Sequence, residues 1–103
     1  MLSKFLEKKV EIILDGFSPK EENSLELEYY LLESDCAGDE EKGFQKAYGV
    51  EIVKKHKGLL NERKKFENVS CSRQTTQNLV ELLAANTVTP STLPYILDDL
   101  IGQ

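Results

Sequence analysis

Tyr48-Gly49-Val50-Glu51-Ile52-Val53-Lys54-Lys55, residues 48–55, is the stretch that decides the fold of this 103-residue chain. Its larger apolar side chains fall at every second position, so Tyr48, Val50 and Ile52 share one face of an extended segment. Glycine, glutamate and valine lie between them and give the opposite face a mixed character. The stretch therefore predicts a β-strand with one face toward an apolar core, and the fold can be worked out from it in both directions.

Two further strands are predicted on the N-terminal side of this stretch. Residues 25–32 alternate in the same way, with one apolar face and one mixed face. Residues 8–15 fit both a strand and an amphipathic helix. We favour a strand from about residue 8, because β-branched residues are concentrated there and Asp15-Gly16 interrupts the pattern, but a short helical lead-in before it stays open. The polar residues 17–24 and the acidic residues 34–46 are expected to form a connector and a mobile loop.

A return strand and then a helix are predicted on the C-terminal side. Residues 63–70 carry Phe66 and Val69 three positions apart, which breaks strict alternation. A bulge near Asn68 would restore it, because a bulge inserts an extra residue into one strand. Leucine spacing then changes to the helical period and predicts a helix over about residues 72–85.

Polar residues mark the ends of this helix and the start of a second one. Ser72 or Thr75 can supply the N-cap oxygen, and Asn86 is a plausible C-terminal stop. A second apolar stripe predicts a helix that begins at residue 91 or 92 and ends at residue 101, with Pro94 in its first turn.

These elements predict a single α+β domain over residues 1–103, in which an antiparallel β-meander of about four strands carries two C-terminal helices packed on one face. The formal net charge of −5 gives no general attraction to nucleic acid or to anionic membranes, so no membrane partner is expected. Cys36 and Cys71 are too few for a disulfide framework, and we expect two reduced thiols in a cytoplasmic protein.

Several of these segments together resemble a known family. Residues 48–55 look like the tyrosine–glycine–aliphatic–glutamate–isoleucine strand of a family of small bacterial proteins of unknown function. In that family a return strand, a leucine-rich helix and a threonine-proline turn precede an acidic last helix. In that order, the matching parts here are Val69-Ser70-Cys71, residues 78–83, Val88-Thr89-Pro90 and residues 95–101. The earlier strand Leu27-Glu28-Tyr29-Tyr30-Leu31 matches as well. The resemblance covers roughly residues 25–101 and implies one compact bacterial domain, but it lends no activity, ligand or catalytic residue.

A cluster of positive charge marks the expected turn between the last two strands. Residues 54–65 have a net charge of +5, whereas the rest of the chain has a net charge of −10. Such a cluster could contact phosphates, but no aromatic residue is interleaved to stack on bases. The plainer interpretation is a solvated hairpin whose lysines prevent edge-to-edge strand pairing. The cations are Lys54, Lys55, Lys57, Arg63, Lys64 and Lys65.

No catalytic, cofactor-binding or metal-binding residue is predicted. Cys36, Cys71 and His56 are far apart in sequence, whereas a zinc site usually includes a closely spaced pair. His56 lies between lysines at an expected hairpin tip, which is convex and offers no cleft. Cys71 lies where a strand meets a helix N-terminus and is the most reactive-looking group, although a half-buried structural thiol is the commoner case. We therefore expect a protein that is not an enzyme and uses no cofactor.

The sheet face away from the helices is the remaining candidate. Tyr30, Leu32 and Val53 fall on it, and together they would form an exposed apolar patch of the kind that often marks an interface. The alternative is that residues 1–7 cover this face or that the apolar residues are scattered.

The hypothesis that best fits these observations is a small non-enzymatic cytoplasmic interaction or regulatory module. It would bind a protein partner or a second copy through the open sheet face or the C-terminal helices. Asp98 and Asp99 of the last helix complement the basic hairpin in charge. The alternative hypothesis is nucleic-acid binding through the basic hairpin at residues 54–65.

Overall fold

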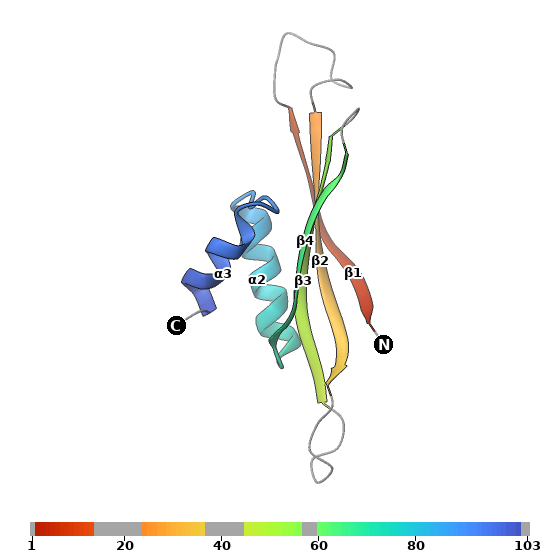
Figure 1. Ribbon diagram of the computed structural model, residues 1–103, viewed down its shortest axis with the longest axis vertical. Coiled ribbons are helices and arrows are strands. Elements are labelled where there is room, and N and C mark those ends of the chain that lie inside the picture. The colour runs from red at the N-terminus through yellow and green to blue at the C-terminus, as the bar shows by residue number, and fades with distance from the viewer. Residues whose placement is uncertain (1, 14–23, 37–44, 57–59, 102–103) are drawn as a thin grey trace.

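The computed structural model describes residues 2–13, 24–36, 45–56 and 60–101, which form a four-stranded sheet and two helices (Figure 1). The strands are antiparallel and lie in the order β1-β2-β3-β4. This arrangement confirms the predicted α+β meander with two C-terminal helices. In chain order the elements are β1 (Ser3–Ile13), β2 (Ser24–Cys36), β3 (Gln45–His56), β4 (Glu62–Ser70), α2 (Arg73–Ala85) and α3 (Leu93–Ile101).

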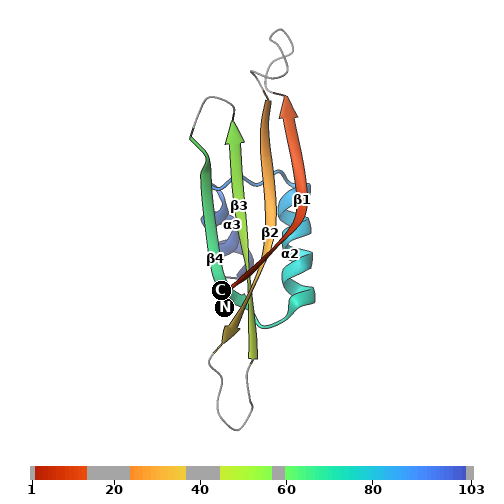
Figure 2. The same ribbon diagram turned by 90° about the vertical axis from the view of Figure 1, so that its right-hand side faces the viewer.

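Both helices cover the same face of the sheet. Figure 2 looks onto the other face and shows α2 behind β1 and β2, and α3 behind β3 and β4. The core forms between them because every second residue of the central strands points toward the helices. The hydroxyl of Tyr29 donates a buried hydrogen bond to the carbonyl oxygen of Val88, 2.8 Å away, and so ties β2 to the segment between the helices. The buried core residues are Leu27, Tyr29, Val50, Ile52, Val80, Leu83, Ala84, Val88, Leu93 and Leu97.

The central pair of strands is longer than the sequence predicts. β2 and β3 pair without interruption from Leu25 opposite His56 to Cys36 opposite Gln45. The acidic loop expected at residues 34–46 is therefore wrong at both ends, and its remainder, residues 37–44, lies outside the described residues. The Lys46 ammonium lies 2.6 Å from the Asp35 carboxylate across the pair. Strand pairing continues through these polar residues because it satisfies their backbone groups whatever their side chains.

β1 confirms the strand favoured for the first segment and extends it backwards to Ser3. The lead-in is thus strand rather than helix. Its register against β2 shifts between Leu6 and Lys8, which leaves Glu7 as an extra residue. The polar connector expected at residues 17–24 lies outside the described residues, apart from Ser24, which begins β2.

The predicted bulge in β4 is confirmed. Phe66 pairs with Val50 and Ser70 pairs with Tyr48, so three residues of β4 lie opposite the single residue Gly49 of β3. Asn68, in the middle of the three, has a φ angle of 59°, in the left-handed region that asparagine tolerates better than most residues.

Polar side chains set the helix ends as expected. The Ser72 hydroxyl accepts a hydrogen bond from the Thr75 amide at 3.2 Å and caps α2. Asn86 is the C-cap, and its side-chain amide donates to the carbonyl of Leu82 at 2.8 Å. α3 begins at Leu93, one residue after the later of the two predicted starts, with Pro94 in its first turn.

Candidate interaction surfaces

The open face of the sheet carries Tyr30, Leu32 and Val53 on the side away from the helices, as their alternation predicts. Leu32 is 1% exposed and Val53 is 2% exposed, and Tyr30 is half-buried. The expectation that these residues show a contiguous apolar patch to solvent is therefore wrong.

Long charged side chains and the first residues of β1 cover this face. The Lys4 ammonium lies 4.4 Å from the centroid of the Tyr30 ring, and Lys4 is also the β1 neighbour of Leu32 in the register. Val53 lies between Glu28 and Arg63 on the adjacent strands. Aliphatic stems of such residues shield apolar neighbours while their charged ends reach water. This geometry fits the alternative interpretation, in which residues 1–7 cover the face.

Two buried carboxylates lie at the centre of the open face. Glu28 accepts a hydrogen bond from the Tyr30 hydroxyl at 2.7 Å and another from the Lys55 ammonium at 3.2 Å. Glu51 lies 3.2 Å from the Lys4 ammonium and 3.9 Å from the Arg63 guanidinium. Each carboxylate thus has cationic neighbours, as a buried charge requires.

These contacts also fix the protonation states of Tyr30 and Glu28. Burial alone would raise the pKa of Glu28, but the hydrogen bonds from Tyr30 and Lys55 and the positive charge of Lys55 outweigh it, so the pKa is lowered. The hydrogen bond to Glu28, with burial and the nearby negative charge, raises the pKa of Tyr30 to about 12. At neutral pH the carboxylate is charged and the phenol is neutral, so the pair is not poised for proton transfer.

Sequence reasoning missed Glu28 and Glu51 as the centre of this face. The sequence does contain a signal for them, because both lie inside strands at positions that alternate with the apolar core residues. Recognising it required the register, which places them beside the cations of the neighbouring strands.

The basic cluster does not form one surface. Alternation places Lys54 and Lys64 on the helix side of the sheet, and Lys55, Arg63 and Lys65 on the open side. Three of these cations lie near carboxylates, since the Lys54 ammonium is also 3.6 Å from Glu62. Lys57 lies outside the described residues. The predicted cluster is thus divided between two faces and partly neutralised.

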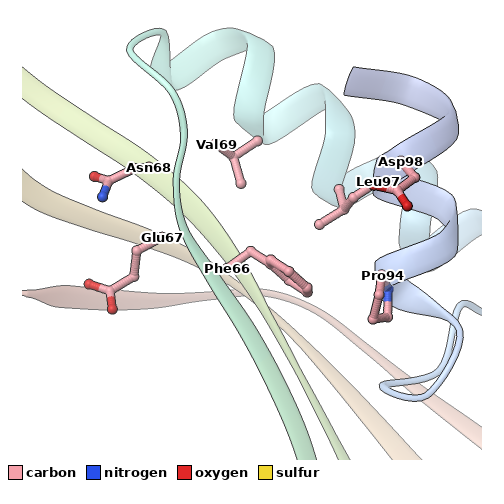
Figure 3. Close-up of a pocket in the computed structure, with 7 residues that line it drawn as sticks. All are labelled: Phe66, Glu67, Asn68, Val69, Pro94, Leu97 and Asp98. Atoms are coloured by element: carbon pink, nitrogen blue, oxygen red, sulfur yellow. The ribbon is translucent and has the colours of Figure 1, made fainter. Parts of the chain in front are cut away.

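A groove that the sequence did not reveal lies between β4 and α3 (Figure 3). Its volume is about 360 Å³. Phe66 and Val69 point into it from β4 while Pro94 and Leu97 line it from α3. The bulge makes this possible, because it turns both Phe66 and Val69 toward the helix although they are three residues apart.

The rim of this groove is polar. Asp98 is exposed on α3, and Figure 3 shows the side chains of Glu67 and Asn68 turned away from the groove toward the other side of β4. β4 is an edge strand of the sheet, and its residues from Glu62 to Lys65 are exposed. The groove therefore combines an apolar floor with the unpaired backbone of a sheet edge, which together can receive an extended chain.

The thiol and imidazole groups are not brought together. Cys71 is a free, exposed cysteine, and the Nε2 atom of His56 is buried without a hydrogen-bond partner in the described structure. The side chain of Cys36 lies outside the described part. Within the described ranges, no group of three or more histidine, cysteine, aspartate or glutamate side chains could hold a metal ion, and no helix is both long and apolar enough to cross a membrane.

Comparison with known proteins agrees with the expectation that the chain belongs to a family of unknown function. One family model, described as "Family of unknown function (DUF6514)", matches residues 8–103. No curated protein and no solved structure matches the chain. The match spans β2 to α3 and all of β1 except its first five residues.

Proposed function

The chain belongs to the DUF6514 family, whose function is unknown, and from its surfaces we propose that it is a non-enzymatic module that binds another protein along β4 and the groove beside α3. The observation that carries the proposal is the apolar floor of Phe66, Val69 and Leu97 beside the free edge of the sheet. Extended segments bind such sites by pairing with the edge and placing alternate side chains in the pocket beside it.

The nucleic-acid alternative has weaker support. Within the described part of residues 54–65 the cations point to two faces, and Lys55 and Arg63 lie against buried carboxylates. Both contacts would compete with phosphates for the same cations. We also place the module in the cytoplasm, because the exposed free thiol of Cys71 suits a reducing compartment.

A capture experiment with a groove variant tests this function. The tagged chain is incubated with lysate of its native host, with and without nuclease, in three forms: wild type, Val69→Glu and Leu60→Glu. Val69 points into the groove, whereas Leu60 is 93% exposed, so the second substitution adds the same charge outside the groove. Circular dichroism and thermal unfolding establish that both variants are folded.

We expect a protein that resists nuclease and binds the wild type and Leu60→Glu but not Val69→Glu. A glutamate on the apolar floor would have to be desolvated by the incoming segment, which is strongly unfavourable. Capture that is unchanged by Val69→Glu would contradict the proposal. Enrichment that disappears with nuclease would instead favour the basic hairpin and nucleic acid.

A further inference from the structure

We propose that the segment which fits β4 is the β4 of a second copy of this chain, paired antiparallel about a two-fold axis at Phe66. This inference rests on the proposed function, since it names the occupant of the same edge and groove. It would join two four-stranded sheets into one and place the two α3 helices on the same side of the seam.

The direction of the backbone groups limits the registers available. A Cβ atom at Gly49 would collide with the carbonyl oxygen of Phe66, which shows that this carbonyl points toward β3. The peptide bond is trans, so the N–H of Glu67 points the opposite way, toward the free edge, and the N–H and C=O groups of Lys65 face the same edge because they alternate with those of Phe66. The Glu67 N–H of each copy can therefore donate a hydrogen bond to the Lys65 carbonyl of the other.

Charge then favours one register among those centred on Lys64, Lys65 and Phe66. In a two-fold antiparallel pair, the residues one step before and one step after the centre lie opposite each other. A centre at Lys64 would place Arg63 opposite Lys65, and a centre at Lys65 would place two lysines face to face. A centre at Phe66 places Lys65 opposite Glu67 of the second copy, twice. Opposite charges at directly facing positions stabilise a sheet, whereas like charges destabilise it.

The same register also fills the groove. Phe66 would face its counterpart across a pair without mutual hydrogen bonds, where side chains approach most closely and aromatic pairs are favourable. Lys64 lies on the groove side, with its ammonium 6.0 Å from the centroid of the Phe66 ring. It would approach the groove of the second copy, whose rim carries Asp98.

The seam is short, because the bulge at residues 67–69 ends regular pairing soon after Phe66. We therefore expect a weak, concentration-dependent dimer. Lysines on an edge strand ordinarily discourage pairing. Here Lys65 would lie opposite Glu67 of the second copy, so the edge would pair favourably with this partner in this register and would still discourage others.

Charge reversal tests the proposal with the full chain in sedimentation equilibrium up to about 1 mM, the range in which weak interfaces are populated. Lys65→Glu and Glu67→Lys each place like charges opposite each other twice, and each should weaken the dimer at least about tenfold. An equimolar mixture of the two variants should recover a 1:1 dimer, because every facing pair is then opposite in charge. The double variant Lys65→Glu/Glu67→Lys should recover it as well. Lys8→Glu, on the other edge strand, is the matched control and should leave the dimer unchanged.

A wild-type chain that remains monomeric at about 1 mM would overturn the proposal, and so would a dimer that either single variant leaves intact. The mixture guards against a misfolded variant, since Lys65 also faces Glu51 within its own chain. A monomeric wild type whose capture of a different protein is lost with Val69→Glu would reject the second copy and retain the proposed function. If the wild type neither dimerises nor captures a protein through the groove, the second copy and the proposed function are both rejected.

Discussion

Gly49 fixes the path of β4 at the level of a single residue. The strand passes so close that a Cβ atom here would collide with the carbonyl of Phe66 and lie 2.9 Å from the Cα atom of Glu67. Both obstacles are backbone atoms, which cannot rotate away as a side chain can. The glycine therefore permits the bulge, and through the bulge it permits the groove.

We expect Gly49→Ala to destabilise the fold by roughly 3 kcal/mol, which is at the upper end for overpacking because β4 as a whole must shift. Urea unfolding measures this change. Lys46→Arg, at an exposed position of the same strand, keeps the positive charge beside Asp35, so it is the control and should leave the free energy of unfolding nearly unchanged. Equal stability of Gly49→Ala and wild type would show that β4 can move at little cost.

At the level of elements, Ser72 is the start signal of α2. Its hydroxyl accepts from the Thr75 amide, one of the amides at a helix start that lack a partner within the helix. We expect Ser72→Ala to reduce the free energy of unfolding by about 1 kcal/mol, the usual effect of losing an N-cap. Ser91→Ala removes an exposed serine whose hydroxyl lies 3.3 Å from the hydroxyl of Thr89, and it should have a smaller effect in the same urea titration. Similar losses for both variants would mean that the cap contributes little.

The elements that the sequence predicts best are those set by local interactions. Ser72 and Asn86 act through their immediate neighbours in the chain, so their types and spacing suffice. The ends of the strands are set differently. Ser34 and Asp35 continue β2 because Ala47 and Lys46 lie opposite them, and no pattern within residues 34–46 encodes that partner.

At the level of the whole molecule, the open face shows why the candidate site was only partly predictable. Alternation correctly assigns Leu32 and Val53 to this face, but their exposure depends on Lys4 and Arg63, which come from other strands. The groove requires even more, since Val69 and Leu97 meet only after the sheet and α3 have packed. Patterns in sequence identify faces, whereas burial on a face depends on contacts between distant segments.

The carboxylate of Glu28 makes the stability of the whole fold depend on pH. Its pKa is lowered in the folded chain from the model-compound value of 4.5, because Tyr30 and Lys55 stabilise the charged form more than burial opposes it. A group whose pKa is lowered by folding stabilises the fold at pH values above its pKa in the unfolded chain. This contribution disappears as the pH falls through its pKa in the folded chain.

We expect Glu28→Gln to be less stable than wild type by about 1–2 kcal/mol at pH 7, with a difference in the free energy of unfolding that narrows below about pH 4.5. Urea unfolding from pH 7 to pH 3 measures the difference, and Glu11→Gln, at an exposed position of the neighbouring strand, is the matched control. A difference that stays constant or widens toward pH 3 would show that the charge on Glu28 does not stabilise the open face.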